Sequence, residues 1–136
     1  MPSGRAPGEL GPLDFVYTPS ADVAADTRWF AEVAGARIVF TVEAMGTRVA
    51  MVELGEGPPV LLAGHLEGER AVLVYRVDDL DATLERLRGR GFEPGGVFEI
   101  PHGPVCPIVA PGGHRLALYQ LIRPGATAHF EGRRDF

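Results

Sequence analysis

The sequence has few of the features that mark secreted, membrane or nucleic-acid-binding proteins. It contains one cysteine, Cys106, so it forms no internal disulfide and fits a reducing cytoplasm. No apolar run is long enough to cross a bilayer, and the first residues lack the basic and apolar segments of a signal peptide. Acidic residues outnumber basic ones by 18 to 13, which argues against nucleic acids and anionic membranes as partners. We therefore predict a cytoplasmic protein with neither kind of partner.

The remaining composition is that of a globular domain. Hydrophobic residues form 46% and charged residues 23% of the 136-residue chain, which suits one compact domain with a hydrophobic core. Residues 1–12 are rich in glycine and proline and lack apolar periodicity, so we predict a flexible leader there. Residues 123–136 mix charged and aromatic side chains. We predict a C-terminal tail over this range and favour its partial docking on the domain over a loose tail.

One pattern of elements occurs twice. An apolar strand over residues 71–77 leads into an acidic cluster and a short amphipathic helix over residues 79–88, with Asp78 as the expected N-cap. Earlier, an apolar stretch near residues 15–18 precedes a helix over residues 21–34. Three pairs keep one offset of 57 positions: Phe15 and Val72, Asp22 and Asp79, Phe30 and Leu87. The sequence therefore predicts one structural module used twice.

Each predicted helix is followed by short strands that alternate apolar and polar residues or are bounded by glycine and proline turns. In the first module we expect strands over residues 38–42, 48–54 and 60–65; in the second, over residues 97–100, 105–110 and 116–122. The order in both modules is strand–helix–strand–strand–strand.

This order resembles the vicinal oxygen chelate superfamily, which includes glyoxalase I, the bleomycin-resistance proteins and the extradiol dioxygenases. The resemblance covers about residues 13–122, and its most specific pieces are Tyr75–Asp81 and the turn and strand Ala110–Tyr119. It implies an α+β fold, in which two tandem βαβββ modules, about residues 13–65 and 71–122, form a curved mixed sheet. The sheet would enclose a cup-shaped cleft and carry the helices on its outside.

The resemblance also identifies four metal-ligand positions, where family enzymes usually carry histidine or glutamate. Here these positions fall on Phe15, Leu61, Val72 and Ala117, none of which binds a metal. We therefore predict that the usual metal site is absent and that no metal or other cofactor is bound. His65, His102, His114 and Glu99 are the alternative donors for an unusual metal site, but their spacing matches no ligand rule.

Other polar residues are open to two interpretations. Cys106 lies in a predicted strand and is interpreted as a small buried hydrophobe rather than a nucleophile. Strand alternation places Tyr17 with Phe15, Tyr119 with Ala117 and His65 with Leu61, facing the cup. Tyr17 and Tyr119 are either ligand contacts or packed aromatics, and Arg48 lies on a neighbouring predicted strand.

Two classes of function remain. The first is a glyoxalase- or bleomycin-resistance-like protein without metal ligands, whose cup binds a mostly apolar, possibly cationic, small molecule. Its ligand-binding residues would be Phe15, Tyr17, Arg48, Leu61, His65, Val72, Ala117 and Tyr119. The second is a lyase, isomerase or dioxygenase of this superfamily, either metal-independent or using an atypical metal, with His65 as general base or ligand. We favour binding, and we expect a homodimer because a repeated module leaves sheet edges to cover.

Overall fold

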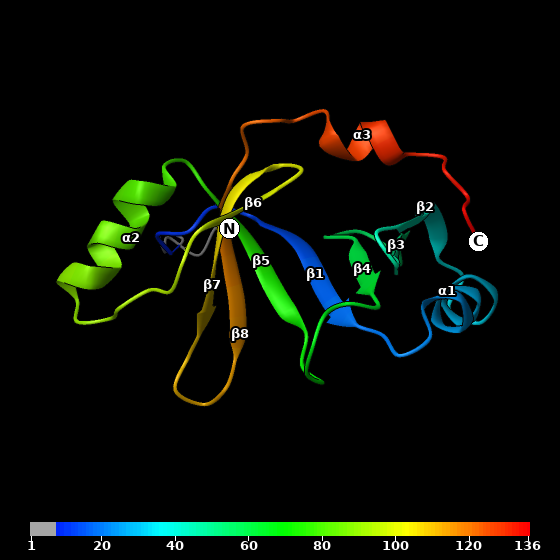
Figure 1. Cartoon of the computed structure of the whole chain (residues 1–136), viewed down its shortest axis with the longest axis horizontal. Coiled ribbons are helices and arrows are strands. Elements are labelled where there is room, and N and C mark those ends of the chain that lie inside the picture. The colour runs from blue at the N-terminus through cyan, green and yellow to red at the C-terminus, as the bar shows by residue number, and fades with distance from the viewer. Residues whose placement is uncertain (1–7) are drawn as a thin grey trace, which may run out of the picture.

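The computed structural model describes residues 8–136 and shows one curved, eight-stranded mixed sheet with three helices (Figure 1). The strands follow the order β2-β3-β4-β1-β5-β8-β7-β6 across the sheet. The elements are β1 (Leu13–Pro19), α1 (Val23–Glu32), β2 (Arg37–Ala44), β3 (Thr47–Glu53), β4 (Val60–Ala63), β5 (Val72–Val77), α2 (Leu80–Gly89), β6 (Phe98–Ile100), β7 (Gly103–Val109), β8 (Arg115–Gln120) and α3 (Ala126–Phe130).

The two halves of the sheet have the same topology. In each module the first strand pairs in parallel with the last, as β1 does with β4 and β5 with β8. The modules join edge to edge through the antiparallel pair of β1 and β5, in which Val16 lies opposite Leu73. The predicted α+β fold with two βαβββ modules is therefore confirmed.

Matching acidic caps start the helices of the two modules. The Asp22 carboxylate accepts a hydrogen bond from the backbone N–H of Ala25, and Asp79 does the same for Ala82, both at 3.0 Å. The expectation that Asp78 caps the second helix is wrong by one residue. Asp79 has the extended backbone of an N-cap and is the residue that lies 57 positions after Asp22. The repeat offset was the better guide to the cap.

Helices α1 and α2 pack on the outer face of the sheet and leave the inner face to the cup. Val23 of α1 packs on Ala50 and Leu62, and Leu80 and Leu84 of α2 pack on Cys106 and Leu118. Figure 1 shows α1 and α2 at opposite ends of the sheet. Val33 follows the last residue of α1, Glu32, and is exposed.

Residues 9–12 lie against the second module. The backbone N–H of Gly11 donates to the carbonyl of Arg76 at 2.8 Å, and Leu10 packs beside α2. A Cβ on Gly11 would lie 2.5 Å from that carbonyl oxygen, so this approach requires glycine. The flexible leader predicted over residues 1–12 is thus ordered at its end, while its first seven residues lie outside the described part of the chain.

The segment after β8 docks on the first module. It passes through α3 to the side of the molecule that holds α1 and β2 (Figure 1). There, residues 132–135 pair with the free edge of β2: the N–H of Thr41 donates to the carbonyl of Arg133, and the N–H of Asp135 to the carbonyl of Thr41, both at 2.9 Å. The partial docking that we favoured is therefore what the structure shows.

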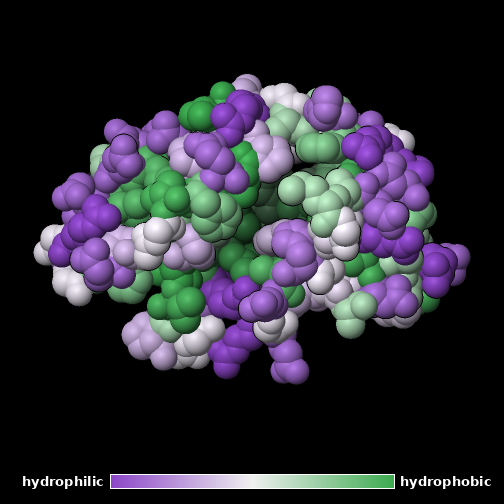
Figure 2. Space-filling view, viewed as in Figure 1, coloured by the Kyte–Doolittle hydropathy of each residue, from purple (hydrophilic) through white to green (hydrophobic). Residues whose placement is uncertain are grey.

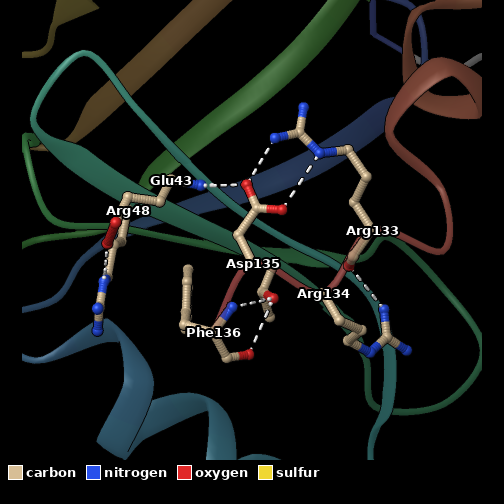
Figure 3. A network of polar contacts seen from close by, with 7 residues as sticks. Glu43, Arg48, Arg133, Arg134, Asp135 and Phe136 are labelled. Carbon is tan, nitrogen blue, oxygen red and sulfur yellow. Dashed lines mark hydrogen bonds and ion pairs between the residues drawn. The ribbon is translucent and has the colours of Figure 1, made fainter.

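Side chains strengthen this contact (Figure 3). The Asp135 carboxylate accepts from the N–H of Glu43 at 2.8 Å, and Arg133 holds the same carboxylate at 2.5 Å. The ring of Phe136 packs against the cluster of Val23, Ala50 and Leu62, with the Arg48 guanidinium 4.8 Å from its centre. The tail is thus an additional edge element of the first module. Among residues 8–136, no helix is long and apolar enough to span a membrane.

Candidate functional site

An apolar floor forms where the inner faces of the two modules meet. Val72, Val74 and Ala117 cluster on one side, and Met51, Phe40 and Leu61 on the other. Phe15 packs against both groups and joins them. The four positions at which the resemblance implies metal ligands, Phe15, Leu61, Val72 and Ala117, are therefore brought to one surface. All four side chains are apolar and form part of this floor.

A hollow lies above this part of the fold. Figure 2 shows it near the centre of the molecule, with hydrophobic side chains inside and mostly polar residues around it. In the same orientation, α3 crosses above the hollow (Figure 1). Phe130 of α3 packs on Phe40, with their ring centres 5.7 Å apart, so α3 forms one wall of the cup. The predicted tail therefore contributes to the candidate site.

One end of the cup carries a buried polar group that the sequence did not reveal. The Tyr119 hydroxyl donates to Oδ2 of Asp14, and Arg76 Nε lies 3.2 Å from the same oxygen. Tyr119 is 1% exposed, and burial together with the adjacent carboxylate raises the pKa of its hydroxyl. Tyr119 therefore stays protonated at physiological pH and acts as a hydrogen-bond donor.

His102 lies beside this group. Its ring centre is 5.2 Å from that of Phe15 and 6.1 Å from that of Tyr119, and its Nε2 is 2.9 Å from the Thr127 hydroxyl of α3. The turn between β6 and β7 holds it there, because the carbonyl of His102 accepts from the N–H groups of Ile122 and Arg123. Burial lowers the pKa of His102, and Arg123 lowers it further, while Asp14 opposes the shift. The neutral imidazole is thus favoured at the wall of the cup.

The opposite end of the cup holds the pair of Tyr17 and His65. The Tyr17 hydroxyl lies 2.8 Å from His65 Nε2, and the Thr47 hydroxyl lies 3.4 Å from its Nδ1. β4 ends at Ala63, so His65 belongs to a turn and is exposed, whereas the sequence placed it on the strand. It reaches the inner face only through Tyr17, whose pKa is raised by burial.

The other candidate residues lie away from the cup. Arg48 alternates with Ala50 towards the outer face and pairs with Glu43 at 2.5 Å. His114 is exposed in the turn between β7 and β8, and Glu99 pairs with Arg123. Cys106 is fully buried under α2, which agrees with its interpretation as a small hydrophobe, and burial raises the pKa of its thiol.

No metal-binding cluster is formed by the part of the chain that the structure describes. Nowhere in residues 8–136 do three histidine, cysteine, aspartate or glutamate side chains converge in a way that suits a metal ion. His65, His102 and His114 belong to three separate turns, so they do not form the alternative donor set.

A separate open pocket of about 620 Å³ lies between the start of α1 and the turn from β2 to β3. Its lining includes Ser20, Asp22, Glu43 and Arg48. These polar groups are already engaged, since Asp22 caps α1, Glu43 pairs with Arg48, and Ser20 donates to Asp26. We assign the site to the cup, where polar groups from distant parts of the chain converge on an apolar floor.

Asp14 and Arg76 are the candidate site residues that sequence reasoning missed, and His102 was considered there only as a donor for an unusual metal site. Arg76 carried a usable signal, because it alternates with Val72 and Val74 along β5. Asp14 carried none, because a bulge between Leu13 and Phe15 interrupts the alternation of β1.

Comparisons with known proteins support the fold. No protein-family model matches the chain, and no curated protein matches it. Methylmalonyl-CoA epimerase from Mycobacterium tuberculosis is similar with a TM-score of 0.72 and 22% identity, over 91% of this chain and 97% of that one. A methylmalonyl-CoA epimerase in complex with methylmalonyl-CoA and NH4+ has a TM-score of 0.66 and 16% identity, over 84% and 96%.

A glyoxalase/bleomycin resistance protein/dioxygenase superfamily member from Vibrio splendidus has a TM-score of 0.61 and 14% identity, over 79% of this chain and 97% of that one. The chain therefore shares its fold with these proteins, and this is the fold that the resemblance in the sequence implied.

Proposed function

We propose that the chain is a metal-free binding protein whose cup holds a mostly apolar small molecule. One observation carries this proposal: the four positions that would hold a metal are apolar and share one packed surface. Such a floor binds hydrocarbon by removing it from water. The polar groups at the two ends, Tyr119 with Asp14 and Tyr17 with His65, would orient the ligand.

The charge of the ligand is a separate question. A cationic ligand would need a carboxylate without a counter-charge, and the cup carboxylate, Asp14, already has Arg76 beside it. The excess of acidic residues over the whole chain is thus not concentrated in the cup. These contacts favour a neutral or anionic ligand over the cationic one.

A thermal-shift screen would test binding. The compounds would include apolar acids, amides and amines, and acyl-CoA thioesters, since one of the similar structures holds methylmalonyl-CoA. A ligand that binds only the native state raises the melting temperature by mass action. Ala117→Phe, which fills the floor, should abolish the shift, whereas Ala34→Phe on the exposed surface should not. Shifts that persist in Ala117→Phe would place binding outside the cup.

The second candidate is an enzyme that uses His65 as general base. The contact between Tyr17 and His65 favours it, because a histidine bonded to a cup residue can exchange protons with a ligand through that hydroxyl. If His65 only binds, His65→Ala should weaken affinity about two- to thirteenfold. If it is the base, turnover should fall by about 10²–10⁴ with affinity nearly unchanged. Conversion by the parent that collapses in His65→Ala would establish the enzyme.

A further inference from the structure

We propose that the cup selects ligands that carry a carboxylate next to their apolar part, and that Arg76 binds this carboxylate. The inference rests on the proposed binding function of the cup and adds the class of ligand.

Strand pairing brings Arg76 to the inner face. Along β5, Val72 and Val74 belong to the apolar floor, and Arg76 is the next residue with the same orientation. It lies opposite Tyr119 of β8, whose ring contacts that floor. The guanidinium therefore extends from the end of the floor, where a polar head group attached to a hydrocarbon chain would lie.

The Arg76 guanidinium approaches Asp14 most closely through its Nε atom. Nε is buried and lies 3.2 Å from Asp14 Oδ2, but its N–H is not aligned for a hydrogen bond. Within residues 8–136, none of the hydrogen bonds involves a terminal nitrogen of Arg76, and the side chain is 41% exposed. A planar pair of N–H donors fits the two oxygens of a carboxylate better than any other common group.

Asp14 positions the Arg76 side chain and leaves its terminal N–H groups available to a ligand. Oδ2 of Asp14 already accepts a hydrogen bond from the Tyr119 hydroxyl, so Arg76 is not the sole partner of this carboxylate. A second positive side chain, Arg123, lies near His102 on the adjacent wall and is bound to Glu99. The carboxylate of a ligand would therefore meet the terminal N–H donors of Arg76 next to the apolar floor that binds its hydrocarbon chain. An ammonium group would instead meet the positively charged partner of the pair of Arg76 and Asp14.

Three probes of equal chain length test whether the cup prefers a carboxylate, a neutral amide or an ammonium group. They are octanoate, octanamide and octylamine, each titrated calorimetrically into the full chain. Octanoate should bind about ten- to a hundredfold more tightly than octanamide, the range expected for a charge-assisted hydrogen bond. Arg76→Gln should remove this preference and leave the affinity for octanamide unchanged. Arg76→Lys, which keeps the charge but loses the fork, should retain only part of it. Arg28→Gln on the exposed face of α1 should bind as the parent does.

The outcomes distinguish the two proposals. Equal affinity for octanoate and octanamide in the parent, tighter binding of octylamine, or a preference that survives Arg76→Gln would overturn the role of Arg76 while the cup remained a binding site. Octanoate binding that persists in Ala117→Phe would also overturn it, because the carboxylate would then be bound elsewhere. If none of the three probes binds, the proposed function fails, and the inference fails with it. Arg76→Lys keeps the test valid if Arg76→Gln does not fold, since it leaves Asp14 with a counter-charge.

Discussion

Replacing Phe136 by alanine tests whether the docked tail contributes to stability. The ring packs against a cluster beneath α1 and lies under the Arg48 guanidinium. Full burial of a phenylalanine is worth about 3–5 kcal/mol against alanine, and Phe136 is partly buried, so we expect a loss of about 2–3 kcal/mol. For a domain of this size, that is a fall in melting temperature of roughly 10 °C.

The measurement is urea unfolding together with limited proteolysis of residues 123–136. Phe98→Ala is the matched control, because Phe98 is 55% exposed on the edge strand β6, and it should change stability by less than about 0.5 kcal/mol. If the tail detaches before the domain unfolds, Phe136→Ala should at least speed cleavage of the tail. A variant that matches the parent in both measurements would refute the idea that Phe136 anchors the tail.

Three further predictions concern metal, pH and assembly. Elemental analysis should find no stoichiometric divalent metal, and a chelator should leave the melting temperature unchanged; one tightly held metal per chain would contradict the metal-free cup. Because burial lowers the pKa of His102, the unfolded chain binds its proton more readily, so stability should fall as the pH drops through the unfolded value near 6.5. His102→Gln, whose side chain can still form a hydrogen bond with Thr127, should flatten the dependence of melting temperature on pH between 7.5 and 5. If the parent and the variant lose stability equally over this range, His102 is not the group responsible. Light scattering at micromolar concentration should give twice the 14.6 kDa chain mass, with the exposed Trp29 of α1 and the exposed Val33 just after this helix as candidate contacts; the mass of a single chain would argue against the dimer.

The fold was predictable because each copy of the repeat has the same short-range sequence pattern. Asp22 and Asp79 open equivalent helices, and the apolar strands before them keep the same offset. The resemblance to the superfamily then placed Phe15, Val72 and Ala117 at equivalent positions facing the cup, and the structure joins them in one floor. The repeat itself needs only neighbouring residues and a constant period to be recognised.

The polar part of the site was less predictable because irregular backbone determines it. The bulge at Asp14 breaks the alternation of β1, and the early end of β4 moves His65 from a strand to a turn. The contact between His102 and Thr127 depends on where α3 docks. Sequence alternation carries no information about any of these three.

The path of the tail has a consequence for how the chain is made. Thr41 of β2 and Phe136, which are bonded in the folded protein, are 95 positions apart, so a ribosome reaches the second roughly 5–20 s after the first. During that interval the edge of β2 and the apolar surface beneath α1 lack their cover, and an open strand edge promotes aggregation. We therefore expect deletion of residues 132–136 to lower the yield of soluble protein in cells by more than the loss of stability measured in vitro. Equal losses in the two measurements would show that the nascent chain does not need this cover.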